Sequence, residues 1–177
     1  MRAVSQLLLR RLGEELRAVE ILAERGHGFQ SATAACNLFE QSHYLTYVGI
    51  SEDDAKKFIE WTDPHKSIIH VKALVDASGP ARGWMPERCE AEYDKYRFLC
   101  GFKHNNPIFQ RILGLPTDPD LFMAQYAVAE SVWNTLSAVG LFAAQFLSIE
   151  NIAPLLEEVN PIMDEVSLLF PVITETK

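Results

Sequence analysis

The stretch that decides the fold is LFMAQYAVAESVWNTLSAVGLFAAQFLS, residues 121–148, in which Glu130 is the only formal charge. Its length and lack of alternating polarity predict one long helix. A helix with so little polar surface belongs in the middle of a bundle. A membrane span is the alternative, but Gln125, Glu130, Asn134 and Gln145 argue against a place in lipid.

A second stretch of the same kind precedes it at residues 29–50, FQSATAACNLFEQSHYLTYVGI, where the only formal charge is Glu40. We therefore expect two central helices, each with one carboxylate near the core. A buried carboxylate must find a cation, a metal ion or hydrogen bonds, or else stay protonated.

Further helices are expected on both sides of these two. Glycines 26 and 28 end the first helix, Ser51 is an N-cap, and Pro86 suits a first helical turn. These further helices are expected at 3–25, 51–63, 65–77, 86–103 and 151–170, and the second central helix at 120–147. A short apolar turn is expected at 108–113, and Pro161 should kink the last helix. No segment has a hairpin signal. The sequence predicts one all-α domain over residues 1–177, an up-and-down bundle of about six to seven helices.

Composition and charge narrow the function. The 177 residues are 48% hydrophobic and 23% charged, as in a single globular domain, which excludes disordered and disulfide-stapled chains. The net charge of −8 disfavours binding to nucleic acids and to anionic membranes, because a uniformly acidic surface repels them. Residues 56–111, however, hold ten basic and seven acidic side chains and form the only net-positive third. An anionic ligand would be accepted there, unless the charges are simply a solvated surface.

The cysteines and the N-terminus indicate the compartment. Cys36, Cys89 and Cys100 are an odd number without C-x-x-C spacing, which favours buried thiols in a reducing environment. The apolar run of three leucines before Arg10 and Arg11 is too short for a signal peptide or a membrane span. We expect a cytoplasmic protein that is not bound to a membrane.

The helix expected at 86–103 carries the candidate site. One stripe, with spacings of 4, 4, 3 and 4, consists of Cys89, Tyr93, Arg97, Cys100 and His104. If this stripe faces inward, Arg97 can bind a core carboxylate, most naturally Glu40 and otherwise Glu130. In one interpretation this pair is structural, and the protein is a non-catalytic module that dimerises or binds another protein.

The segment from Arg97 to His104 also fits the R-x(4–6)-H pattern of HEPN domains, the "higher eukaryotes and prokaryotes nucleotide-binding" helical bundles. The wider layout, with Phe39-Glu40 before a Tyr-rich helix that ends in His, resembles a related uncharacterised bacterial helical family. The likeness covers about residues 29–106. It implies a homodimer and a metal-independent endoribonuclease without a cofactor, in which Arg97 and His104 are catalytic.

In this reading Arg97 stabilises phosphate charge and His104 transfers a proton. The substrate, RNA or a nucleotide, would be contacted by Lys103, Asn105, Asn106, Tyr93 and Glu40. The leucine-rich stripes of the first and last helices are a separate reason to expect self-association.

A metal-binding bundle is the third interpretation. Glu40 and His43 form one Glu-x-x-His pair, the ligand motif of di-iron helical bundles. A second pair is missing, and only the single carboxylates Glu92 and Glu130 could complete the set. The alternative is that His43 is a hydrogen-bonded core residue beside Tyr44.

Overall fold

A computed structural model describes residues 2–61, 63, 68–104 and 118–146, together with the single positions 154, 157 and 161. All regular structure in these residues is helical, which confirms the all-α bundle. The elements are α1 (Arg2–Glu24), α2 (Gly28–Ile50), α3 (Glu52–Glu60), α4 (Val71–Ser78), the 3-10 turn η1 (Pro80–Arg82), α5 (Pro86–Lys103) and α7 (Pro119–Phe146). In the described part of the chain, no helix is long and apolar enough to cross a bilayer.

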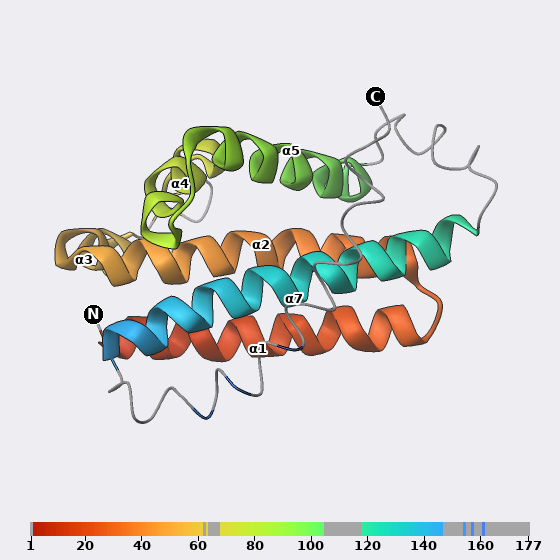
Figure 1. Ribbon diagram of the computed structural model, residues 1–177, viewed down its shortest axis with the longest axis horizontal. Coiled ribbons are helices and arrows are strands. Elements are labelled where there is room, and N and C mark those ends of the chain that lie inside the picture. Colours follow the sequence, from red (N-terminus) through yellow and green to blue (C-terminus); the bar gives the residue numbers. More distant parts are fainter. Residues whose placement is uncertain are drawn as a thin grey trace.

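The three long helices α1, α2 and α7 form one layer of the bundle (Figure 1). At one end Leu8 of α1 and Val48 of α2 pack with Ala138 of α7. At the other end Val19 of α1 and Met123 of α7 pack with the first half of α2. Helix α1 is therefore antiparallel to α2, whereas α7 runs parallel to α2.

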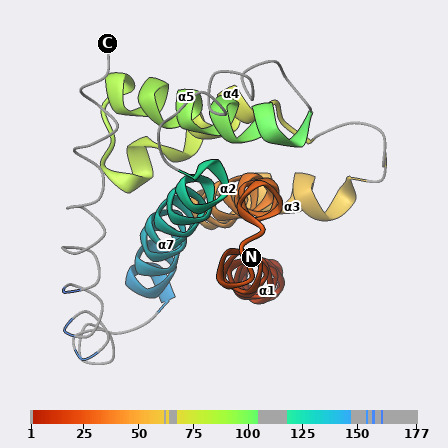
Figure 2. The ribbon, with the colours of Figure 1, turned by 90° about the vertical axis from the view of Figure 1, so that its right-hand side faces the viewer.

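Helices α4 and α5 cover the other side of α2, as the end-on view shows (Figure 2). Phe39 of α2 joins Val75 of α4 and Cys89 of α5 in a smaller core. Because α2 packs against α1 and α7 within its own layer and against α4 and α5 in the other, it is buried along nearly its whole length. Its side chains meet those of α5 and α7 in an interior that also contains charged groups.

The expected helix boundaries follow local signals. Gly26 adopts a left-handed φ of 75° and ends α1, with its N–H donating to the Ala23 carbonyl at 3.0 Å. The Ser51 hydroxyl accepts the N–H of Asp54 at 3.3 Å and caps α3. Pro86 is the first residue of α5. The predictions for α1, α2, α5 and α7 agree with the structure to within about one residue.

Two expected helices are shorter than predicted. The helix expected at 65–77 begins only at Val71, because His70 is its N-cap and its Nδ1 accepts the N–H of Lys72 at 3.3 Å. Ile68 and Ile69 therefore precede the helix. The helix expected at 51–63 ends at Glu60. The prediction for 108–113 lies outside the described residues, and only positions 154, 157 and 161 of the helix predicted at 151–170 are described, all three as helical, so its extent and the kink at Pro161 stay predictions.

The apolar stripe of α1 is used within the chain. Val4, Leu8, Leu12 and Val19 are at most 9% exposed and pack against α2 and α7. The matching stripe at 151–170 is not part of the described structure. Self-association, which was expected partly from these two stripes, stays a prediction.

The start of α2 crosses the start of α7 at Gly28, where a Cβ would overlap the backbone carbonyl of Asp120. We expect Gly28→Ala to lower the free energy of unfolding by about 1–3 kcal/mol through overpacking. Gly13→Ala is the matched control, because Gly13 is exposed in α1 with open space around it. It should raise stability by roughly 0.5–1 kcal/mol. Urea denaturation compares the two, and equal effects would contradict the close crossing.

Candidate functional site

The buried face of α5 differs from the predicted one. Its buried residues include Glu92, Leu99 and Phe102, at 0%, 1% and 5% exposure. The Arg97 side chain, in contrast, is 67% exposed. The expectation that Arg97 points into the bundle is therefore wrong, although Cys89 of the predicted stripe is buried and Cys100 is half-buried.

The expected ion pair between Arg97 and Glu40 is also wrong. Arg97 instead pairs with Asp94 on its own helix, at 3.2 Å between Nη1 and Oδ1. Glu40 does contact α5, but its partner is Tyr96, whose hydroxyl donates to Oε1 at 2.9 Å. The sequence thus predicted the right pair of helices and missed the contacting residue on α5 by one position.

The other predicted site residues lie around the C-terminal half of α5. Lys103 and His104 are exposed, and the Lys103 ammonium donates to Oδ1 of Asn37 at 3.1 Å. Tyr93 is half-buried and stacks on Tyr96 at 6.1 Å between ring centroids. Asn105 and Asn106 lie outside the described residues.

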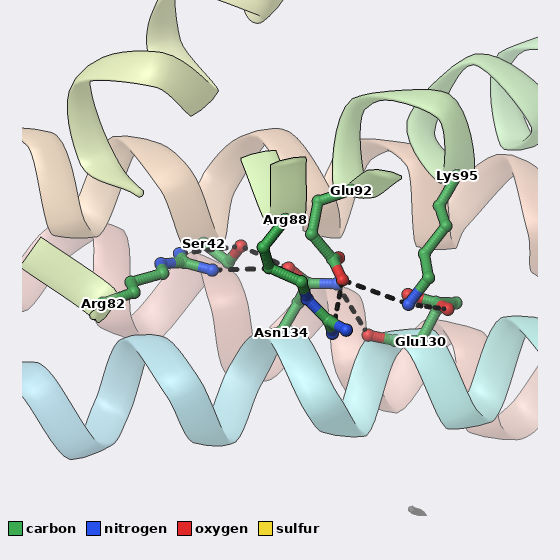
Figure 3. A network of polar contacts seen from close by, with 7 residues as sticks. All are labelled: Ser42, Arg82, Arg88, Glu92, Lys95, Glu130 and Asn134. Atoms are coloured by element: carbon green, nitrogen blue, oxygen red, sulfur yellow. Dashed lines mark hydrogen bonds and ion pairs between the residues drawn. The ribbon is translucent and has the colours of Figure 1, made fainter. Parts of the chain in front are cut away.

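A buried charge cluster connects α5 with α7 (Figure 3). Glu92 and Glu130 are at most 1% exposed, and the Lys95 ammonium lies between them. Its Nζ is 3.1 Å from Oε1 of Glu92 and 3.0 Å from Oε1 of Glu130. Arg88 adds a second cation to Glu92, at 2.5 Å from Nη2 to Oε1. An ion pair between α5 and α7 therefore exists, but its cation is Lys95 and not the predicted Arg97.

The carboxylates of Glu92 and Glu130 share the ammonium of Lys95, and this arrangement affects the pKa of Glu130. Burial raises the pKa of Glu130 to about 7; the charge of Glu92 raises it further, while Lys95 opposes the shift. Oε2 of Glu92 and of Glu130 have no hydrogen-bond partner among the described residues. With this pKa, Glu130 is partly protonated near neutral pH, although it is almost fully buried.

Arg82 extends the polar interior toward α2. Its guanidinium donates to the hydroxyls of Thr46 at 3.1 Å and Ser42 at 3.2 Å, and to Oδ1 of Asn134 at 3.4 Å. Burial lowers the pKa of Arg82 to about 9, against a smaller opposing effect of Glu92. Arg82 therefore stays charged at neutral pH, held mainly by neutral acceptors.

His43 is fully buried beside this arginine. Its Nδ1 is 2.6 Å from the Ser78 hydroxyl, which itself donates to the Leu74 carbonyl at 2.8 Å. Because the hydroxyl proton is used there, we assign the imidazole proton to Nδ1. Burial, and then the charge of Arg82, hold the pKa of His43 well below its usual value, so the ring is neutral.

The Glu40–His43 pair does not converge on a metal position. Glu40 is bound to Tyr96 of α5, whereas His43 is bound to Ser78 of α4. Among the residues that the structure describes, no group of three or more His, Cys, Asp or Glu side chains is placed to hold a metal ion. These contacts favour the interpretation of His43 as a hydrogen-bonded core residue.

Arg82, Arg88 and Lys95 were not singled out from the sequence. The spacing of three between Glu92 and Lys95, and of four between Arg88 and Glu92, was the local signal that could have found two of them. Arg82 had no such signal, because its partners come from α2 and α7.

The interior and the surface of α5 thus have different chemistry. The buried cluster of Glu92, Lys95 and Glu130 can tie helices together and store a proton. The exposed side carries Arg97, Lys103 and His104, which can meet a ligand from solvent. No protein-family model, no curated protein and no solved structure matches this chain.

Proposed function

We propose that this protein is a cytoplasmic HEPN-like protein that binds single-stranded RNA through the exposed C-terminal half of α5. The observation that carries the proposal is the exposure of Arg97, Lys103 and His104 on one short helical segment. Arg97 and His104 are seven residues apart, so they lie on one face about 10 Å from each other along the axis. That distance suits contacts to neighbouring phosphates.

The local charge also supports binding of an anion. From residue 95 to residue 103, α5 contains no acidic residue, and the exposed cations of this range are Arg97 and Lys103. Asp94, an acidic residue one turn before Arg97, is 61% exposed in its ion pair with Arg97. An exposed ion pair of this kind is weak, so a phosphate can replace Asp94 as the partner of Arg97. Glu92 and Glu130 do not oppose an anion at the surface, because both are buried beside cations.

Cleavage requires one further step beyond binding. A neutral His104 would take the proton of a ribose 2′-hydroxyl, whose oxygen attacks the adjacent phosphorus while the 5′-oxygen leaves with a proton from water. Arg97 would stabilise the charge that develops on the phosphate. The products of this route are a cyclic 2′,3′-phosphate and a 5′-hydroxyl.

Binding is tested with a fluorescent single-stranded RNA across a salt series. We expect Arg97→Ala and Lys103→Ala each to weaken binding and to reduce the slope of log K against log salt by about 0.7 per lost phosphate contact. Lys56→Ala is the matched control, because Lys56 is an equally exposed cation in a weak ion pair on α3. Equal effects of all three variants, or no binding by the wild type, would contradict the proposed surface.

Cleavage is tested with mixed cellular RNA in the presence of EDTA. We expect His104→Ala to reduce the rate roughly 10²–10⁴-fold while leaving binding and the circular dichroism spectrum unchanged. Cleavage by neither protein would exclude catalysis and leave a binding module. Equal cleavage by both would show that His104 does not act in the reaction.

A further inference from the structure

Two cysteines that are far apart in the sequence lie in contact between α2 and α5. The Sγ atoms of Cys36 and Cys100 are 3.2 Å apart, and both thiols are free. A disulfide requires about 2.0 Å between the sulfurs, so closure requires an approach of roughly 1.2 Å. Cys89, the third thiol, packs elsewhere, against Phe39 and Val75.

The two thiols differ in their access to solvent. Cys36 is fully buried in the face of α2, whereas Cys100 is half-buried on α5. Lys103 follows Cys100 by three residues, about one helical turn further along α5. Only Cys100 is therefore open to a small reactant and next to a cation that stabilises a thiolate.

We propose that Cys36 and Cys100 form a reversible dithiol–disulfide pair oxidised by hydroperoxides, with Cys100 as the attacking thiol and Cys36 as the resolving thiol. This modification site is independent of the proposed RNA-binding function. It uses the contact between α2 and α5, and oxidation would link the two layers of the bundle covalently.

The electrostatics agree with this assignment. The hydrogen bond from Cys36 lowers the pKa of Cys100 to about 7, and the charge of Lys103 acts in the same direction, whereas burial and the charge of Glu40 oppose the shift. The contact with Cys100, together with burial, raises the pKa of Cys36. At neutral pH Cys100 is thus partly thiolate, and Cys36 keeps its proton until the second step.

The chemistry is balanced in two steps. The Cys100 thiolate attacks one peroxide oxygen, the O–O bond breaks, and the released oxygen leaves as water or alcohol with a proton from solvent. Cys100 is then a sulfenic acid. The Cys36 sulfur attacks the Cys100 sulfur, the S–O bond breaks, and the leaving hydroxide combines with the Cys36 proton to form water. The two thiols lose two electrons to the peroxide, and a dithiol reductant reverses the change.

The test is to treat the purified chain with one equivalent of hydrogen peroxide, block free thiols with N-ethylmaleimide in denaturant, so that the buried Cys89 is also reached, and map the peptides by mass spectrometry. We expect an intramolecular link between Cys36 and Cys100, a mass lower by about 2 Da before blocking, and blocking of Cys89 alone. Dithiothreitol should return all three thiols. A wild-type map with no such link, or with links that involve Cys89 to the same extent, would overturn the proposal.

Variants separate the roles of the two thiols. In Cys36→Ser we expect Cys100 to accumulate as a sulfenic acid that dimedone traps, because its resolving partner is missing. In Cys100→Ser the remaining thiols should not be trapped, while Cys89→Ser should behave as the wild type. Trapping at Cys36 in Cys100→Ser would reverse the assigned order. If Cys36→Ser does not fold, as judged by circular dichroism, Cys36→Ala provides the same test.

Discussion

Lys95→Met should lower the free energy of unfolding at pH 8 by about 1–3 kcal/mol, because it leaves two buried carboxylates with too few cations, a cost that Glu130, with a pKa of about 7, limits by taking up a proton. Lys95 lies between Glu92 and Glu130, within 3.1 Å of an oxygen of each. Without its ammonium, Arg88 remains on Glu92, and Glu130 loses its ion-pair partner. Methionine has a side chain of similar length, so the decrease in the free energy of unfolding comes from the missing charge and not from a cavity. Urea denaturation of both proteins at pH 8 gives the difference.

Two further variants test whether the loss of stability in Lys95→Met comes from the buried charge cluster. Arg97→Ala removes an ion pair on the same helix whose two side chains are 67% and 61% exposed, and it should leave the urea midpoint nearly unchanged. Adding Glu130→Gln to Lys95→Met should recover much of the loss, because the stranded charge is then absent. A Lys95→Met protein as stable as Arg97→Ala would show that the buried cluster does not stabilise the bundle.

The fold was predictable because its signals are strong and local. The nearly uncharged stretches at 29–50 and 121–148 became the buried helices α2 and α7. Ser51 and Pro86 mark helix starts through a hydrogen bond and a fixed φ that depend only on neighbouring residues. The start of α4 was missed because His70 caps it through a ring nitrogen, a role that residue type alone does not indicate.

The orientation of α5 was not predictable from its own residues. Its buried face includes an ionised pair, Glu92 with Lys95, while Tyr93 lies half-exposed on the neighbouring face. The usual contrast between apolar and charged faces is therefore weak in this helix. The sequence of α5 therefore supports a buried face through Tyr93 and Arg97 as well as it supports the observed one through Glu92 and Leu99. Only the packing of α5 against α2 and α7 distinguishes the two faces.

The spacing of residues within one helix does not predict which residues of two different helices are in contact. Cys36 and Cys100 are 64 positions apart, and their contact depends on how α5 is placed along α2. The same is true of Lys95 with Glu130 on α7. The sequence did indicate that Glu40 and Glu130 need partners near the core, since each is the single charge of its stretch. It did not indicate which donors reach them.

Glu130→Gln should change how stability depends on pH between about pH 5 and pH 8. Burial first, and Glu92 second, raise the pKa of Glu130 from its usual 4.5 to about 7 in the folded protein. Between these values the folded protein holds a proton that the unfolded chain releases, so this contribution to stability is complete below pH 4.5 and is lost as the pH rises through 7. The loss amounts to about 3 kcal/mol.

Because glutamine does not titrate, the variant lacks this contribution, and other groups cancel in the comparison. We expect the free energy of unfolding of the wild type, minus that of Glu130→Gln, to fall by about 2–3 kcal/mol from pH 5 to pH 8. Val128→Ala, a change in a neutral residue packed against the core two positions away, should differ from the wild type by the same amount at both pH values. Urea denaturation across this range measures all three proteins. A constant difference between the wild type and Glu130→Gln would mean that Glu130 is already ionised at pH 5 in the folded protein, with Lys95 outweighing both burial and Glu92.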